Sequence, residues 1–440
     1  MKRSIRYLLL HIVKIRKREI MHIRGFVLVL MVFISLILLS GLFSSCARLS
    51  MEQKQLFSPT PSSQTPTPIV TVGPVATPVV SQTPNQESKP IPDSMLTPRP
   101  SASPKPSASP KSSSVPSSKP SVAPSSTLKP SPGIVNPYVP YTHEQMMAEG
   151  KKLAEKYPDI LSLDSIGGSV EGRDLLLIKL GKGEKKIILC GTHHAREYIS
   201  SSYLMKMTEE YAKSYMGSGI FGKYDVKDLL NKVTLYIVPM VNPDGVNLVN
   251  KGVKAVENQE SVEAMALVKP TYREWKANIN GVDLNRQYPA YWAEKYDNVG
   301  KPASENFKGT ASATEPEVQA MMKLSEENNF VLAASFHTKG NLIYWADKGT
   351  VNQISGVEAR AKALAKLTKY KLMPISEKPS VYGAGYENWF RLEFKRPAFC
   401  IELTPSNRTD VPHDDRKFDS LIWSKAKYIG LFLADELSKR

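Results

Sequence analysis

One stretch in the middle of the chain constrains the fold more than any other, because a strand pattern and a helix pattern meet in it. Residues 187–190 form the apolar run Ile-Ile-Leu-Cys, which is typical of a buried parallel strand. Gly191 ends this run, and apolar residues then recur at helical spacing over residues 199–211. A buried strand that leads into an amphipathic helix predicts an α/β fold with a largely parallel sheet.

His194 and Glu197 lie at the junction between this strand and this helix. The carboxyl ends of strands in open α/β sheets are where ligands bind. Side chains three positions apart in a helical turn lie on the same side, and imidazole and carboxylate groups are common zinc ligands. The pattern therefore predicts either a metal site or a polar helix start with a spare histidine. The metal site is favoured only if the rest of the chain supplies a third ligand and a base.

Two later strands supply those missing groups. Residues 331–336 form an apolar strand that ends in His337, and residues 398–402 form another that ends in Glu402. A carboxylate in a buried strand must be paired or placed at a functional cleft. Two histidines and two glutamates at the ends of separate elements match a hydrolytic zinc site, which needs three ligands and one base.

Other segments complete a predicted domain over residues 136–440, in which a mixed, mostly parallel sheet has helices on both faces. Thr142 with Gln145, and Thr314 with Glu317, each predict a capped helix start, and the Asn-Pro-Asp-Gly sequence of residues 242–245 predicts a turn. The remaining predicted elements are an edge hairpin over 162–166 and 175–180, a strand over 233–240, and helices over 356–369 and 419–437.

The first 135 residues are expected to lie outside this domain. Residues 1–50 combine a basic segment with the apolar run 25–43, which is about long enough to span a bilayer. This run leads to Ser-Ser-Cys, which predicts a secretory signal with Cys46 as a lipidated residue; the alternative is an uncleaved anchor helix. Residues 51–135 are dominated by Pro, Ser and Thr, and this composition predicts a disordered linker. We therefore expect the domain to be membrane-anchored at a bacterial cell surface.

The net charge of +16 does not indicate a nucleic-acid partner. Residues 1–135 hold 16 of the 58 Lys and Arg residues but only 4 of the 42 Asp and Glu residues, so most of the excess lies outside the predicted domain. We also see no basic stripe interleaved with aromatic residues. Cys190 and Cys400 lie in predicted core strands, where we expect free thiols. We expect a monomer.

Residues 136–440 resemble zinc carboxypeptidases of the carboxypeptidase A type. The resemblance implies an eight-stranded, mostly parallel mixed sheet and one zinc ion. It rests on six segments that follow the family's order: the His-x-x-Glu segment (191–199), the Asn-Pro-Asp-Gly segment (241–245), the Asn-Arg segment (281–286), Phe336-His337, Tyr382 and Glu402.

The resemblance assigns the chemistry of hydrolysis to particular residues. His194, Glu197 and His337 are expected to bind zinc, which would activate a water molecule. Glu402 is expected to act as the general base and then the general acid. Asp283 is expected to orient the first zinc histidine and fix its tautomer.

The resemblance also assigns residues that contact the substrate. Asn285 and Arg286 are expected to hold the substrate carboxylate, and Tyr382 to close over the substrate. The family's transition-state arginine, which follows a tryptophan, is replaced here by Lys276. Lys276 or Arg196 is therefore expected to stabilise the oxyanion, and the sequence leaves the choice open.

The family has a non-proline cis peptide bond two residues after its base. In this chain that position is Thr404–Pro405, which we therefore expect to be cis.

Residues 275–285 resemble the bacterial branch that cleaves γ-D-glutamyl–diamino acid bonds. Glu387, near the family's side-chain specificity position, would favour a cationic side chain such as that of diaminopimelate or lysine. We expect a peptidoglycan-peptide hydrolase that acts on peptide or muropeptide substrates. The alternatives are a general extracellular carboxypeptidase that removes basic residues, and an inactive wall-binding lipoprotein.

Overall fold

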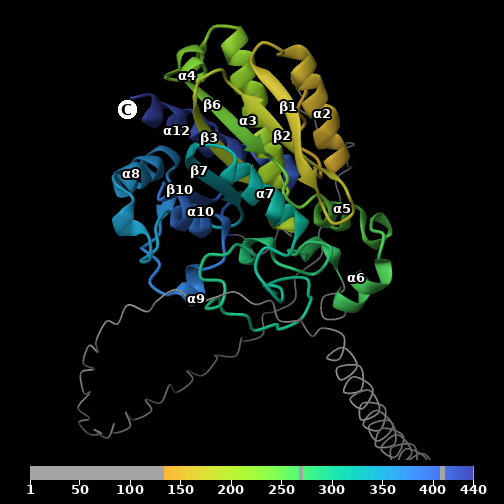
Figure 1. Cartoon of the computed structure of the whole chain (residues 1–440). Coiled ribbons are helices and arrows are strands. Elements are labelled where there is room, and N and C mark those ends of the chain that lie inside the picture. The colour runs from red at the N-terminus through yellow and green to blue at the C-terminus, as the bar shows by residue number, and fades with distance from the viewer. Residues whose placement is uncertain (1–132, 267–270, 407–411, 440) are drawn as a thin grey trace, which may run out of the picture. The chain divides into compact units, whose positions relative to one another are not determined.

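A computed structural model describes residues 133–266, 271–406 and 412–439, and an eight-stranded sheet forms their centre (Figure 1). Four neighbouring strands, β6, β3, β7 and β10, run parallel, and so do β8 and β9. The pairs β1–β2, β2–β6 and β10–β8 are antiparallel, so the predicted mixed, mostly parallel sheet is confirmed. The strands lie in the order β1 (Leu161–Gly168), β2 (Asp174–Leu180), β6 (Val233–Val238), β3 (Lys185–Gly191), β7 (Phe330–His337), β10 (Ala398–Glu402), β8 (Leu342–Tyr344) and β9 (Lys371–Leu372).

Helices cover both faces of this sheet, and the sequence of β3 shows why. Ile187 and Leu189 belong to the core on one face, whereas Ile188 and Cys190 belong to the core on the other. Successive side chains of a strand point to opposite faces, so a sheet covered on both sides requires a continuous apolar run. The first core lies under α2 (His143–Lys156), α3 (Ile199–Met216), α8 (Val357–Thr368) and α12 (Ile429–Ser438), and the second under α7 (Pro316–Glu326) and α10 (Tyr386–Phe394).

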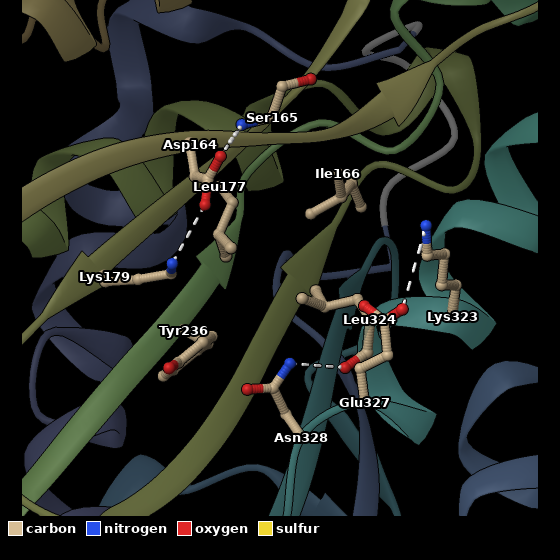
Figure 2. Close-up of a pocket in the computed structure, with 10 residues that line it drawn as sticks. All are labelled: Asp164, Ser165, Ile166, Leu177, Lys179, Tyr236, Lys323, Leu324, Glu327 and Asn328. Carbon is tan, nitrogen blue, oxygen red and sulfur yellow. Dashed lines mark hydrogen bonds and ion pairs between the residues drawn. The ribbon is translucent and has the colours of Figure 1, made fainter.

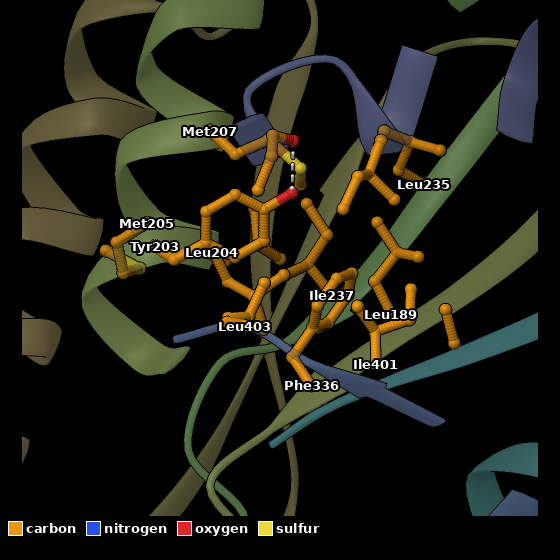
Figure 3. Packing of buried hydrophobic residues seen from close by; sticks show 14 of the residues in the cluster. Leu189, Tyr203, Leu204, Met205, Met207, Leu235, Ile237, Phe336, Ile401 and Leu403 are labelled. Carbon is orange, nitrogen blue, oxygen red and sulfur yellow. Dashed lines mark hydrogen bonds between the residues drawn. The ribbon is translucent and has the colours of Figure 1, made fainter. Parts of the chain in front are cut away.

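Figure 3 shows part of the first core, where side chains of α3 pack against the sheet. Tyr203 and Met207 of this helix are fully buried, as the helical spacing predicted. They pack in the same cluster as Leu189 of β3 and Phe336 of β7. α3 is thereby fixed against β3, which precedes it in the chain, and against the neighbouring β7.

The shorter elements are α4 (Val226–Lys232), α5 (Pro243–Lys251), α6 (Gln259–Ala266), α9 (Pro379–Tyr382), α11 (Ser424–Ala426), and the hairpin of β4 (Ile220–Phe221) with β5 (Tyr224–Asp225).

The predicted N-terminal parts lie almost entirely outside the described residues. This holds for the apolar run 25–43, for Cys46 and for the linker up to residue 132. Among the residues that the structure does describe, no helix is both long enough and apolar enough to cross a membrane.

The helix starts agree only in part with the prediction. Thr142 caps α2, because its hydroxyl oxygen accepts the Gln145 backbone N–H at 3.3 Å. Thr314 does not cap α7, which begins at Pro316 after Glu315. Proline is well suited to a first helical position, and it sets this start later than the capping pattern indicated.

The sequence predicts a free turn over 242–245, but this segment is the beginning of α5. Asn242 caps this helix by accepting the Gly245 backbone N–H at 3.0 Å, and Pro243 is its first residue. The turn signal and the helix-start signal use the same residue types, which is why the sequence pattern did not separate them.

The predicted last helix is interrupted near Tyr428. The Tyr211 hydroxyl donates to the Lys427 carbonyl at 2.8 Å and accepts the Leu431 backbone N–H at 3.3 Å. A side chain inserted between these two groups replaces a helical hydrogen bond and breaks the helix. A π-helical turn (Asp419–Trp423) and α11 precede the interruption, and α12 follows it.

The predicted cis bond at Thr404–Pro405 is wrong. Within the described ranges, the one cis peptide bond joins Thr338 and Lys339, directly after β7. A prolyl bond lowers the cost of the cis form but still favours trans by about 0.5–1 kcal/mol, so the proline did not determine the isomer.

Candidate metal centre and substrate pocket

Three neighbouring parallel strands bring the predicted site residues to one edge of the sheet. β3 leads into His194 and the 3-10 turn Ala195–Glu197, while β7 ends in His337. β10 ends in Glu402, which lies directly beside His337 in the register of these two strands. The carboxyl ends of parallel strands meet at the same edge, which explains why residues far apart in sequence converge here.

The three predicted ligands form one buried cluster. The two histidine Nδ1 atoms lie 3.2 Å apart. The Glu197 carboxylate bridges them, with Oε1 at 2.9 Å from His194 Nδ1 and Oε2 at 3.0 Å from His337 Nδ1. Ligand atoms from all three residues lie within 4.8 Å of one another. Two ligands of one tetrahedral zinc ion, each about 2.1 Å from it, lie roughly 3.4 Å apart, so the donor set and its spacing fit zinc.

The charges of this cluster are strongly coupled. Burial opposes ionisation of Glu197, but the neighbouring His194 and His337 outweigh it and hold the pKa of this carboxyl well below its usual value. Burial also opposes protonation of His337, yet the Glu197 and Glu387 carboxylates raise its pKa well above the usual value. The ionised Glu197 carboxylate can bind a cation, and a metal ion that binds His337 would displace the proton of that ring.

Asp283 supports the first ligand from behind. Its Oδ1 lies 3.1 Å from His194 Nε2, while its Oδ2 accepts hydrogen bonds from Lys276 Nζ at 2.8 Å and from Arg286 Nε at 3.2 Å. Burial alone would raise the pKa of Asp283, but Lys276 and His194 hold it well below the usual value. A carboxylate that accepts the Nε2 proton leaves the Nδ1 lone pair facing the cluster.

Glu402 has the properties of a proton-transfer group. Its Oε2 atom is buried and has no hydrogen-bond partner among the described residues. Burial, together with repulsion from Glu197, raises the pKa of Glu402 to about 8. A carboxyl group whose pKa lies near neutrality can both accept and return a proton.

The two cations predicted for the oxyanion have different partners. Lys276 is bound to Asp283 behind the cluster, and its charge also lowers the pKa of Glu402. Arg196 instead donates to the Glu274 carbonyl at 2.8 Å and pairs with Glu305 at 3.0 Å. The fold therefore brings Lys276 to the site and directs Arg196 to another set of partners.

A pocket of about 160 Å³ adjoins the cluster. Asn285 connects the two, since its Nδ2 lies 3.4 Å from His337 Nε2. Glu387 lies against the same histidine at 3.6 Å and also accepts a hydrogen bond from Ser335. Other lining residues come from the β10–β8 side of the sheet and from α9 and α10: Tyr344, Ala346, Ser376, Val381, Tyr382, Gly383, Gly385, Asn388, Arg391 and Cys400, together with Lys295.

Two predicted substrate residues sit differently with respect to this pocket. Tyr382 lines it and packs edge-to-face on Tyr291 at 5.5 Å; burial raises the pKa of its hydroxyl to about 12. Arg286 is not a lining residue, because its guanidinium donates to Asp283, the Tyr296 carbonyl and Asn306. Arg286 thus ties Asp283 to the 296–306 segment rather than lining the pocket.

The sequence reasoning missed most of the pocket lining, including Lys295 and Cys400. Lys295 lies in a segment with no helical or strand periodicity, and only its proximity to the Asn-Arg segment could have pointed to it. Cys400 is a free thiol, as expected, but it also lines the pocket. Burial and the nearby Glu387 keep the pKa of this thiol well above its usual value, so it is not a nucleophile.

A second pocket, of about 240 Å³, lies on β1, β2, β6 and the end of α7 (Figure 2). Its charged side chains already pair with one another: Lys179 with Asp164 at 3.0 Å, and Lys323 with Glu327 at 3.8 Å. None of the predicted site residues lines it, so we assign it no role in catalysis.

Comparisons with known proteins agree with this geometry. A family model described as zinc carboxypeptidase matches residues 146–416. The chain is 35% identical over 303 residues to gamma-D-glutamyl-L-diamino acid endopeptidase 1 of Lysinibacillus sphaericus. The aligned region covers 68% of this chain and 73% of that protein. It is 28% identical over 225 residues to the human carboxypeptidase N catalytic chain, and this aligned region covers 48% of this chain and 45% of the human chain.

A solved structure shows the shared fold. Bovine thrombin-activatable fibrinolysis inhibitor, in complex with tick carboxypeptidase inhibitor, superposes with a TM-score of 0.53 at 21% identity. The superposition covers 68% of this chain and 97% of that chain.

Proposed function

The chain belongs to the zinc carboxypeptidase family, and on this premise we propose that it is an exported metallopeptidase that hydrolyses γ-D-glutamyl–diamino acid bonds in peptidoglycan peptides. The convergence of His194, Glu197 and His337, with Glu402 beside them, is the observation that carries the proposal. It supplies three ligands for one metal ion and one carboxyl, with an Oε2 atom unpaired in the part of the chain that the structure describes, for proton transfer.

Each residue of the cluster has a separate role in hydrolysis. A zinc ion held by the three ligands would polarise the scissile carbonyl and lower the pKa of a bound water. Glu402 takes the proton of the attacking water and returns it to the leaving amine. Asp283 keeps the His194 ring in the binding tautomer, and Lys276 stabilises the negative charge that develops on the carbonyl oxygen.

The substrate side of the mechanism follows from the pocket. Asn285, Tyr382 and the adjacent Arg286 hold the carboxylate of the residue that follows the scissile bond. Glu387 places a negative charge among the pocket walls, where the side-chain ammonium of a diamino acid is stabilised. The name of the Lysinibacillus relative supports the same substrate class.

The proposal of export rests on residues 1–135. The apolar run 25–43, the Ser-Ser-Cys that follows it and the Pro/Ser/Thr-rich linker are what a tethered surface enzyme requires. A surface location would place the domain beside peptidoglycan, its proposed substrate. Metabolic labelling with a palmitate analogue, with Cys46→Ala as the control, tests lipidation directly.

Mass spectrometry of digested muropeptides tests the function. The purified protein, loaded with zinc, should release diamino-acid-containing fragments from γ-D-glutamyl tripeptides, and a chelator should stop the reaction until zinc is restored. Hippuryl-amino acid substrates, in which an ordinary peptide bond precedes the C-terminal residue, serve as the comparison. Faster cleavage of the hippuryl substrates than of the tripeptides would refute the peptidoglycan assignment.

The acidic pocket residue also favours a second candidate function, the removal of C-terminal lysine or arginine from ordinary peptides. Glu387→Gln should then abolish a preference for basic over apolar C-terminal residues. Zinc content must be measured in the same samples, because Glu387 also contacts His337.

A further inference from the structure

We propose that Lys295 binds the side-chain carboxylate of the substrate's C-terminal diamino acid, so that the pocket selects a diamino acid with two carboxylates, such as diaminopimelate, over lysine. The inference rests on the proposed function and specifies which diamino acid the site takes.

Lys295 reaches the pocket from a segment that the structure holds firmly. The Lys295 backbone carbonyl accepts a hydrogen bond from Lys308 Nζ at 2.9 Å, and its backbone N–H donates to the Tyr291 carbonyl at 3.1 Å. Its ammonium donates to the Val381 carbonyl, next to Tyr382. The side chain therefore lies in one cavity with Asn285 and Tyr382, where the substrate carboxylate is expected.

The ammonium of Lys295 has no carboxylate partner among the described residues. Arg391, the other cation that lines this pocket, is paired with Asp347 at 2.9 Å and is thereby neutralised. Burial and the nearby Arg286 lower the pKa of Lys295 to about 8, so the protonated form of Lys295 is less stable here than that of an exposed lysine. A partly buried cation without a counter-ion is a position where a ligand anion is bound tightly.

The charges around the pocket match one kind of ligand. Lys295 provides a positive charge without a carboxylate partner in the described part of the chain, and Glu387 provides a negative charge. A C-terminal diaminopimelate residue carries two carboxylates and one ammonium, so it offers one carboxylate to Asn285 and Tyr382, the second carboxylate to Lys295 and the ammonium to Glu387. A C-terminal lysine has no second carboxylate, and it would leave Lys295 without a counter-ion in a desolvated site.

A purely structural role for Lys295 makes a different prediction. Its contact with the Val381 carbonyl could serve only to hold the Tyr382 segment in place. Loss of that contact would then slow cleavage of every substrate by the same factor. A carboxylate-binding role affects only substrates that carry the second carboxylate, so the ratio of two kcat/KM values separates the roles.

The test compares three tripeptides, L-Ala-γ-D-Glu followed by diaminopimelate, by diaminopimelate with its side-chain carboxylate amidated, or by L-lysine. The enzyme is the zinc-loaded full chain. Wild type should cleave the first peptide about 10- to 100-fold more efficiently than the other two, as expected for one charge-assisted hydrogen bond. Lys295→Met should remove this preference by lowering kcat/KM for the first peptide alone. Lys348→Met, which removes an exposed lysine paired with Glu377, should change nothing.

Two outcomes would overturn the inference while leaving the proposed function intact. One is wild-type cleavage of all three peptides at similar rates, which needs no variant to fold. The other is an equal loss for all three peptides in Lys295→Met. Failure of the wild type to cleave any of them, with zinc bound and hippuryl substrates turned over, would instead overturn the proposed function itself.

Discussion

Asp283 lies 3.1 Å from Nε2 of His194, on the side of the ring opposite the Nδ1 atom that faces Glu197 and His337. This contact determines which ring nitrogen carries the proton and therefore which one is free to bind a metal ion. Lys276 and Arg286 both hold the same carboxylate in place.

Asp283→Asn should weaken zinc binding about 10- to 100-fold, because an amide can hold the imidazole in the wrong tautomer. Competition with a fluorescent zinc chelator measures the change. Asp228→Asn, at an exposed aspartate that pairs with Lys232, is the control and should bind zinc like wild type. Unchanged affinity in Asp283→Asn would show that this carboxylate does not set the tautomer.

Glu402→Gln should retain zinc but lose about 10²- to 10⁴-fold in kcat, the range for general acid–base catalysis. The amide keeps the shape of the side chain and cannot transfer the proton. Metal analysis and single-turnover kinetics on the same preparation separate the two effects. Glu377→Gln, an exposed glutamate, is the control. A variant that keeps most of its activity would exclude Glu402 as the base.

Lys276→Met should lower kcat about 100-fold, because an oxyanion donor acts only in the transition state. Arg196→Met should change kcat by no more than about threefold, since its partners are the Glu274 carbonyl and Glu305 rather than a residue of the metal-ligand cluster. Lys276→Arg should restore part of the activity, which loss of folding would not allow. A larger effect of Arg196→Met than of Lys276→Met would reverse the assignment.

Glu317 should make the free energy of unfolding depend on pH. It is buried on α7, where Asn278 Nδ2 donates to it at 3.3 Å. Burial, with the carboxylates of Asp244 and Glu315, raises its pKa to about 8 from the ordinary 4.5. The folded state therefore binds a proton that the unfolded state has lost, so its contribution to stability is complete below about pH 4.5 and disappears as pH rises through 8.

Glu317→Gln, which mimics the protonated form, should remove this part of the pH dependence. Urea denaturation at about pH 5, 7 and 9 measures it as the difference between variant and wild type. Glu326→Gln, at an exposed position of the same helix, should leave the wild-type slope unchanged. An identical slope in wild type and Glu317→Gln would contradict the prediction.

The residues that cluster at the sheet edge could be named from the sequence because local patterns mark their positions. His194 and Glu197 follow an apolar strand at a fixed spacing, and His337 and Glu402 each end a strand of the kind that must be buried. Their convergence could not be derived from local patterns alone. β6 lies between β3 and β7 in sequence but on the outer side of β3 in the sheet, so strand order cannot be read from chain order.

The walls of the pocket were less predictable, for a physical reason. Residues 287–315 contain no strand and no α-helix, and backbone carbonyls that accept from long side chains position them. Examples are the Tyr296 carbonyl bound by Arg286 and the Lys295 carbonyl bound by Lys308. Such contacts leave no periodic trace in a sequence, and Lys295 could therefore not be assigned before the structure was known.

The strand that leads to His194 and the strands that end in His337 and Glu402 occupy the interior of the sheet, with further strands hydrogen-bonded on either flank. Such a location is among the last parts of a domain to open, because fraying begins at edges and termini. On heating, release of zinc should consequently coincide with melting of the whole domain rather than precede it. A dye that reports free zinc and a calorimeter that reports heat uptake should then record one and the same transition.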